Sequence, residues 1–150
     1  MRTITITSLR APADDQDGFY RMLVLQHWTN RIELRIRILQ VLASLVYGQV
    51  TTYRRIAIYL GLPAWEAQNI GTLLKEIEEK LEGRFHTEQV LHEDGTCSPK
   101  YPGGEGEQAS RLLTRGVSCH SIYRVGGIGF KVNNFTAHLY IRIIPMRKAA

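Results

Sequence analysis

Apolar residues recur at helical spacing directly after residue 30. In the segment 31–46 they lie three or four positions apart, and arginines fall on the opposite face. The repeating positions are Leu34, Ile38, Val41, Leu42 and Leu45. Gly48 follows, and glycine commonly ends a helix. The pattern therefore predicts a helix over 31–46.

The next thirty residues predict two more helices joined by a short turn. Thr51 and Thr52 are suited to cap a helix over 53–60. Pro63 favours the start of a third helix over 64–80. The apolar stripe of that third helix consists of Ala67, Ile70, Leu74 and Ile77. Two helices separated by a Gly-Leu-Pro turn predict a helix-turn-helix.

The rest of the chain alternates between polar and apolar residues more often than it repeats with a helical period. The predicted elements are a strand at 3–7, a helix or strand at 19–27, a strand, an Asp-Gly turn and a second strand within 85–98, a loop at 99–107, a helix at 108–116, a hairpin over 117–132 and a strand at 135–144. The hairpin is expected to turn at Gly126 and Gly127.

The charge balance adds one indication about partners. The 150 residues carry a formal net charge of +5, and 14 of the 19 basic residues are arginine. Arginine presents a planar fork that matches phosphate, so this bias favours an anionic partner. A charge that merely keeps the protein soluble explains the same number equally well. The length fits one domain that buries a core without metals or disulfides.

The cysteines, histidines and glycines exclude several kinds of site. Cys97 and Cys119 are too few for a disulfide framework. Together with His92 and His120 they lack the paired spacing of a zinc site, so neither a metal nor a cofactor is expected. The glycine-rich loop 103–106 lacks the Lys-Ser/Thr that would follow in a phosphate cradle.

The N-terminal residues indicate where the protein is found. They alternate threonine and isoleucine and do not form the apolar segment of a signal peptide. No apolar run reaches the length needed to span a membrane. We therefore expect an intracellular protein with no membrane partner, in the cytoplasm or nucleoid, or in the nucleus of a eukaryote.

Short motifs around the helix-turn-helix occur in an order that indicates a family. They are Gly48–Tyr53 (GQVTTY), Ile56-Ala57, Gly61–Pro63, Ala67–Gly71, Gln89–Leu91, Asp94-Gly95 and Gln108–Val117. In order and spacing they resemble the DNA-binding domain of O-6-alkylguanine-DNA alkyltransferases and, more closely, the alkyltransferase-like proteins. The resemblance covers about residues 32–117.

The resemblance implies an α+β fold of the winged helix-turn-helix type with small β-hairpin elements. It implies that this domain spans 31–120 and follows an N-terminal extension over 1–30, which holds the short strand. Residues 121–150 would form a C-terminal β-strand segment packed on the same domain.

The resemblance also implies a role in DNA binding and repair, with double-stranded DNA as the partner. In the family the helix-turn-helix enters the minor groove, an extruded guanine enters a pocket, and an arginine fills the gap left in the stack. Tyr53 stands where the family's tyrosine contacts the backbone of the flipped nucleotide. The implied DNA-binding positions are Thr51, Thr52, Tyr53, Arg54, Arg55, Gln68, Asn69, Thr72 and Lys75.

Several arginines are candidates to hold phosphates. They are Arg31, Arg35, Arg37, Arg54, Arg55 and Arg84. Arg54 and Arg55 oppose the dipole of the helix predicted over 53–60, a small penalty that a bound phosphate would offset.

The chain departs from the family at its reactive site. Gln68 replaces the arginine that fills the stack, and it is shorter and uncharged. Thr87 occupies the reactive cysteine or tryptophan position, and a hydroxyl is far less nucleophilic than a thiolate without an activating base. Glu88 is a base by type or a solvated surface residue, and Gln89 replaces an arginine. We therefore expect a degenerate alkyl pocket at Thr87, Glu88 and Gln89, and no enzymatic activity.

Two alternatives stay open. The first is a winged-helix protein-interaction module, or a subunit of a larger nucleoprotein complex that docks through its terminal segments. The second is an active alkyltransferase that uses Cys119 with His120. Neighbours in a strand point to opposite faces, which argues against a direct Cys119–His120 pair.

Overall fold

The computed structural model of the protein describes residues 16–140. Its elements, in chain order, are α1 (Gln16–His27), α2 (Ile32–Ser44), β1 (Thr51–Thr52), α3 (Tyr53–Tyr59), the 3₁₀ turn η1 (Ala64–Glu66), α4 (Ala67–Leu81), the 3₁₀ turn η2 (Thr87–Gln89), β2 (Val90–Leu91), α5 (Glu105–Thr114), β3 (Cys119–Arg124), β4 (Gly127–Val132) and α6 (Phe135–His138). The mixture of helices and strands confirms the predicted α+β class.

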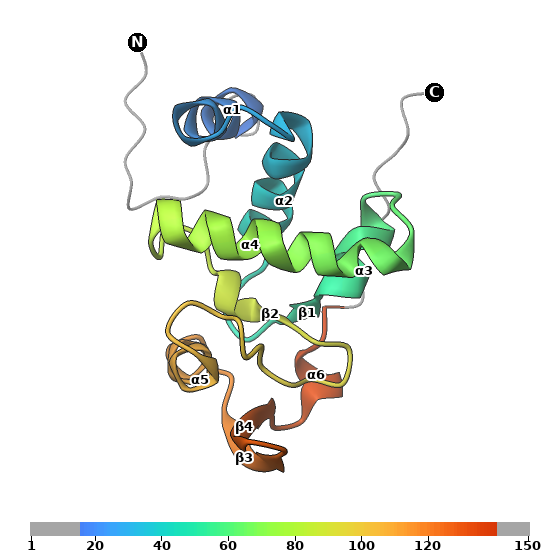
Figure 1. Cartoon of the computed structure of the whole chain (residues 1–150), viewed down its shortest axis with the longest axis vertical. Coiled ribbons are helices and arrows are strands. Elements are labelled where there is room, and N and C mark those ends of the chain that lie inside the picture. The colour runs from blue at the N-terminus through green and yellow to red at the C-terminus, as the bar shows by residue number, and fades with distance from the viewer. Residues whose placement is uncertain (1–15, 141–150) are drawn as a thin grey trace.

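The elements form two layers on either side of a short parallel ladder. Helices α1 to α4 lie above β1 and β2, while α5, α6 and the β3–β4 hairpin lie below them (Figure 1). In the ladder, Thr51 pairs with Val90 and Thr52 pairs with Leu91. Val50, directly before β1, forms a parallel bridge with Leu139 and so adds a third segment to the ladder. The ladder therefore joins the two layers.

The three central helices follow the apolar patterns that predict them. α2 buries Ile38, Leu42 and their neighbours on one face, within the predicted segment 31–46. The Thr52 hydroxyl accepts a hydrogen bond from the Arg55 N–H at 3.1 Å and so caps α3 as expected. Segment 19–27, for which a helix and a strand were both open, belongs to helix α1.

Each layer has its own apolar cluster. The helical core lies among α1 to α4 and consists of Tyr20, Leu23, Val24, Ile36, Ile38, Leu39, Val41, Leu42, Leu45, Ile56, Ala57, Ile70, Leu73, Leu74, Ile77, Leu81, Phe85 and Val90. The lower core lies among β2, α5 and the hairpin and consists of Val50, Leu91, Cys97, Leu112, Val117 and Val132. The lower core is the smaller of the two, with six buried residues against eighteen in the helical core.

The prediction for 85–98 is correct at the turn and wrong about the strands. The Gly95 N–H donates to the His92 carbonyl at 2.9 Å, and Gly95 takes a φ of 84°, so the Asp-Gly turn is present. The strand before it is only β2, which pairs with β1 and is preceded by a 3₁₀ turn. After the turn, Thr96 forms an isolated bridge with Lys131.

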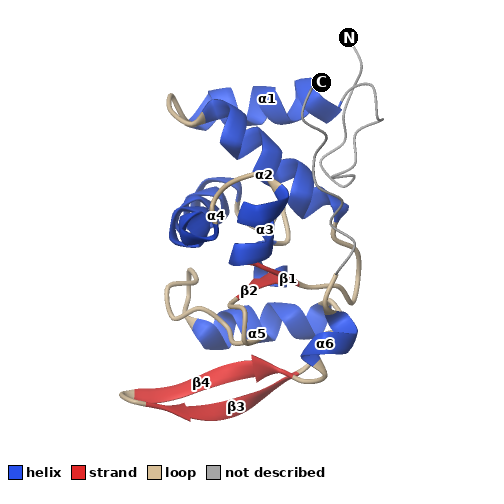
Figure 2. Ribbon diagram, turned by 90° about the vertical axis from the view of Figure 1, so that its right-hand side faces the viewer, coloured by secondary structure: helices blue, strands red, loops and turns tan. Residues whose placement is uncertain are grey.

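The predicted hairpin is confirmed, and the strand predicted after it is wrong within the described residues. β3 and β4 pair from Cys119–Val132 to Arg124–Gly127, and the hairpin projects from the lower end of the molecule (Figure 2). Phe135–His138 forms the short helix α6 where alternation predicted extended chain.

A tertiary contact explains that helix. Asn134, the residue before α6, takes a left-handed φ of 51°. The Phe135 ring packs on Gly95 so closely that a Cβ there would lie 2.8 Å from Phe135 Cγ. Residues 141–144 of the predicted strand, and the strand at 3–7, lie outside the described residues. None of the helices within 16–140 is long and apolar enough to cross a membrane.

Candidate functional site

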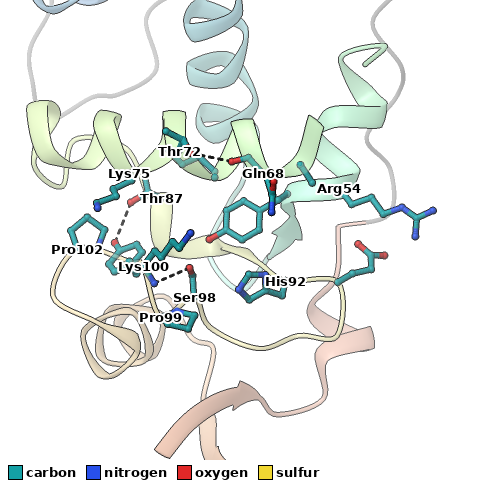
Figure 3. A pocket seen from close by; sticks show the side chains of 16 residues that line it. Arg54, Gln68, Thr72, Lys75, Thr87, His92, Ser98, Pro99, Lys100 and Pro102 are labelled. Atoms are coloured by element: carbon teal, nitrogen blue, oxygen red, sulfur yellow. Dashed lines mark hydrogen bonds between the residues drawn. The ribbon is translucent and has the colours of Figure 1, made fainter. Parts of the chain in front are cut away.

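A pocket of about 550 Å³ opens between the two layers. α3 and α4 form its upper wall, and the chain from the β2 end to residue 102 forms its lower wall (Figure 3). Its lining residues are Tyr53, Arg54, Ala67, Gln68, Gly71, Thr72, Leu74, Lys75, Thr87, His92, Glu93, Ser98, Pro99, Lys100, Tyr101 and Pro102. The volume falls in the range of small-molecule and cofactor pockets, roughly 300–1,000 Å³.

Tyr53 is the first residue of α3 and lies at the junction of the two walls. Its ring packs against His92, with ring centroids 5.3 Å apart, and lies over Gly71, where a Cβ would be 3.8 Å away. Burial raises the pKa of Tyr53 to about 12, although a hydrogen bond with Ser98 acts in the opposite direction. The phenol therefore stays protonated at neutral pH and can donate a hydrogen bond.

His92 supports the ring of Tyr53 without adding a charge. Burial lowers the pKa of His92, and the nearby Asp94 opposes that shift only in part. The imidazole is therefore neutral at pH 7. The positive charge of this site has to come from its lysines and arginines.

Thr87 is buried at one end of the pocket within a polar network. Its hydroxyl donates to Glu78 Oε1 at 2.6 Å and lies 3.1 Å from the Tyr101 hydroxyl. Arg111 Nη1 donates to Glu78 Oε2 at 2.7 Å and to the Tyr101 hydroxyl at 3.2 Å. The backbone N–H of Gly83 also donates to Glu78 Oε2. The network fixes Thr87 and satisfies a buried carboxylate.

Sequence reasoning missed Glu78, Tyr101 and Arg111. Glu78 is only 4% exposed, and it follows Leu74 by four positions along α4. An acidic residue in the register of an apolar stripe was the available signal. Tyr101 and Arg111 carried no local signal, because loop 99–104 and α5 reach this position only through the fold.

Three cations surround the mouth of the pocket. Arg54 extends outward from α3, while Lys75 on α4 and Lys100 on the loop lie toward the other end (Figure 3). All three are exposed. Arg55 forms an ion pair with Glu93 at 3.5 Å, and this pair offsets part of the negative charge of Glu93. The rim is therefore positively charged in spite of its one carboxylate.

Two predicted DNA-binding threonines lie behind the pocket. Thr51 and Thr52 are fully buried in β1, and the Thr52 hydroxyl both caps α3 and donates to Glu93. Their side chains therefore have no exposed surface for a ligand, and they hold Tyr53 in place. Asn69, also predicted, donates from Nδ2 to Glu66 Oε2 at 3.0 Å and does not line the pocket.

The structure also corrects one of the phosphate-binding candidates. Arg35 is 3% exposed and forms an ion pair with Glu76 at 2.8 Å. Its guanidinium also donates to Asn30 and stacks 4.6 Å above the Trp28 ring. Arg35 therefore stabilises the helical layer and is not available to phosphate, whereas Arg31, Arg37 and Arg84 are exposed.

Known proteins of similar sequence and fold are of the alkyltransferase-like type. No protein-family model matches the chain. Alkyltransferase-like protein 1 of Schizosaccharomyces pombe is 29% identical over 102 residues, which cover 67% of this chain and 89% of that protein. Two solved structures of the S. pombe protein, both in complex with DNA, share the fold. The resemblance to alkyltransferase-like proteins is confirmed.

The structural similarity extends over most of the described chain. The first S. pombe complex has a TM-score of 0.63 and 26% identity. The second, which contains O6-carboxymethylguanine, has a TM-score of 0.59 and 25% identity. Each alignment covers 75% of this chain and 98% of the other. The fold of this chain is therefore similar to that of an alkyltransferase-like protein over nearly the whole length of that protein.

The two residues that follow Thr87 in the alkyltransferase-like motif lie outside the pocket. Glu88 is 3% exposed, so it is not a solvated surface residue, and its Oε2 contacts His86 Nδ1 at 3.0 Å. Gln89 is buried and donates to the carbonyls of Val46 and Gln49. Of the three expected pocket residues, only Thr87 lines the cavity.

Cys119 is the nucleophile in the alternative hypothesis of an active alkyltransferase. It lies on β3 and does not line the pocket. It shares a hydrogen bond with Cys97, and neighbouring His120 binds Asn133 through Nδ1 at 2.6 Å. The two residues therefore point to different partners. Within residues 16–140, no group of three or more His, Cys, Asp and Glu side chains is placed to hold a metal.

Proposed function

We propose that this protein is a non-catalytic DNA-binding protein of the alkyltransferase-like type. In this proposal α3 and α4 act as a winged helix-turn-helix that enters the minor groove of duplex DNA. The pocket then receives a nucleotide extruded from the duplex. Similarity to two protein structures solved with DNA supports the binding role.

The positively charged pocket mouth carries the proposal. Arg54, Lys75 and Lys100 line the pocket mouth, and in this proposal they bind the phosphates that flank the extruded nucleotide. Tyr53 presents a protonated phenol at the same mouth, which suits a hydrogen bond to a phosphate oxygen. The cavity behind them, about 550 Å³, has room for a purine with a small substituent.

The pocket chemistry favours recognition over group transfer. Alkyl transfer to the protein needs a strong nucleophile in the cavity, and none of the lining residues has a thiol. The Thr87 hydroxyl already donates its proton to Glu78, and that carboxylate also binds Arg111 and the Gly83 N–H. This threonine is thus part of a structural network.

The test is a fluorescence-anisotropy titration with duplexes that differ only at one guanine. The probes carry guanine, O6-methylguanine or O6-carboxymethylguanine, and each is measured at two salt concentrations. We expect binding that weakens with salt, since phosphate contacts release counterions. Tyr53→Ala should weaken binding of the modified duplexes by roughly tenfold, the effect of about one charge-assisted hydrogen bond with its packing.

Matched variants separate the contributions. Tyr53→Phe keeps the ring and removes the hydroxyl, so it isolates the phosphate contact. Arg54→Ala should lower affinity and the salt slope together, whereas Arg21→Ala on α1, far from the pocket, should change neither. Wild type that fails to bind any duplex would refute the proposal.

A mass measurement tests the non-catalytic part. After incubation with the O6-methylguanine duplex, the intact protein should keep its mass. A gain of one methyl group would establish transfer, and peptide mapping would show whether Cys119 or Thr87 accepted it.

An interaction module is the second candidate, and the hairpin favours it. Tyr123 and Val125 are almost fully exposed at its end, and Ile128 is also exposed. Exposed apolar side chains that lie together often mark a protein contact. A protein that binds no duplex in the titration, yet loses a partner on Tyr123→Ser/Ile128→Ser substitution, would support this function.

A further inference from the structure

Trp65 is an exposed aromatic residue directly before α4. It is the middle residue of η1 and exposes 73% of its surface. Tryptophan offers a large flat apolar surface and is enriched at the energetic centres of binding sites. Trp65 does not line the pocket, so the site described above gives it no role.

Trp65 continues the row of α4 residues that borders the pocket. Gln68, Thr72 and Lys75 follow it at three, seven and ten positions, which is the spacing of one helical face. All three are exposed and line the pocket. The 3₁₀ turn η1 leads directly into α4, so Trp65 precedes Gln68 by three positions at the start of this run of exposed residues.

The backbone that carries Trp65 is held on both sides. The Leu62 N–H donates to the Ala57 carbonyl at 2.8 Å, and the Glu66 N–H donates to the Pro63 carbonyl at 2.9 Å. The Glu66 side chain in turn accepts from Asn69 on α4. The turn is therefore fixed while the ring stays in solvent, which lowers the entropic cost of binding through this residue.

The composition of this face indicates what it would contact. Along the row, Gln68 and Thr72 are polar and Lys75 is cationic, while Arg54 adds a second exposed cation beside them. Cations with one flat aromatic ring suit a nucleic acid, because phosphates bind the charges and bases stack on the ring. Gln68, the next residue on the face, has far less surface for stacking.

We propose that Trp65 stacks on a base of duplex DNA next to the nucleotide that enters the pocket. Proteins that bind the minor groove often insert an apolar side chain at a base step. The inference rests on the proposed function, since it requires DNA on the exposed face of α4. Trp65 then supplies the stacking surface, while Tyr53 and the rim cations hold the backbone.

The first test compares Trp65→Ala, Trp65→Phe and Leu25→Ala in the anisotropy titration. Leu25 is the control, because it is a large apolar residue on α1 with 58% exposure. Trp65→Ala should weaken duplex binding by roughly tenfold or more, in line with loss of one base–aromatic stack. Trp65→Phe should retain most of the affinity, and Leu25→Ala should leave it unchanged. Thermal unfolding should be the same for all variants, since both side chains are exposed.

The second test reads the stack directly. DNA should quench the indole emission of the wild type and leave Trp65→Phe, in which Trp28 is the remaining tryptophan, unchanged. Wild-type affinity in Trp65→Ala would overturn the inference and leave the proposed function intact. Affinity lost without quenching would overturn the stacking role. No binding by the wild type would refute the proposed function and, with it, the inference.

Discussion

The two layers of the protein are stabilised in different ways. The helical core has eighteen buried apolar residues, and the lower core has six. The lower layer is instead connected to the ladder by buried polar side chains, most clearly by Gln108. Since each layer provides one wall of the pocket, one wall depends on apolar packing and the other on a few hydrogen bonds.

Gln108 shows how much one polar side chain connects. Its Oε1 accepts from the Ser98 N–H at 2.8 Å, and its Nε2 donates to the carbonyls of Glu88 and Val90. It thereby attaches α5 to the start of the pocket loop and to β2. We therefore expect that the pocket can lose its lower wall while the helices above stay folded.

The largest expected effect tests the helical layer. Leu39 is fully buried on α2, and Leu39→Ala should lower the free energy of unfolding by roughly 2–5 kcal/mol through lost burial and the cavity left behind. Urea denaturation followed by circular dichroism measures it. The exposed Leu25→Ala should change stability by less than about 0.5 kcal/mol. A small effect of Leu39→Ala would show that this layer is loosely packed.

The next effect tests the lower wall. Gln108→Ala leaves three buried backbone groups without their partner and should cost roughly 2–3 kcal/mol. Amide hydrogen exchange should show lost protection in α5 and β2 while α2 keeps its own. Ser110→Ala, on the exposed side of α5, is the control. Equal loss in both layers would mean that they unfold as one unit.

A third prediction compares two carboxylates that bind the same arginine. Glu78 is 4% exposed and Glu107 is 44% exposed, measured on their side chains, and both accept from Arg111. Glu78→Gln should cost roughly 1–2 kcal/mol, because the buried Thr87 hydroxyl and Arg111 lose a charged partner. Glu107→Gln should cost less than about 0.5 kcal/mol. Similar values from chemical denaturation would show that burial does not set the difference.

The smallest expected effect is a dependence on pH at the junction of the layers. Burial lowers the pKa of His92 below its usual 6.5, so protonation favours the unfolded chain. The stability contributed by neutral His92 is complete above pH 6.5 and falls as the pH drops toward the folded-state pKa. We expect a small loss of stability, seen as a lower melting temperature at pH 5 than at pH 7.5. His92→Phe should flatten that dependence, and an unchanged profile would contradict the assignment.

The sequence predicts the helical layer well for a physical reason. α2, α3 and α4 bury one face each, so their apolar periodicity is visible locally, and α2 runs over 32–44 where 31–46 was expected. The lower layer follows long-range contacts. Phe135 packs on Gly95 at the start of a helix. β1 pairs with β2 although α3 and α4 separate the two strands in the sequence. Neither contact is visible in a local pattern.

The site divides in the same way. The family motif predicted Thr87 in the pocket and Tyr53 at the DNA backbone, and both residues line the cavity. The motif did not predict the hydrogen-bond network behind Thr87. Tyr101 and Arg111 belong to segments that reach Thr87 only in the folded protein. Glu78 was detectable from its register with Leu74 on α4.

The ladder between the layers also constrains the order in which the protein can form. It contains Val50, β1, β2 and Leu139, so its last member comes near the end of the described chain. Contacts between sequence-distant segments form slowly, whereas helices α1 to α4 contact near neighbours. During synthesis the residues of helices α1 to α4 are all translated before Leu139 is. We therefore expect ribosome-bound chains that stop before Leu139 to carry a folded helical layer and an unfinished pocket, which would mature only after release.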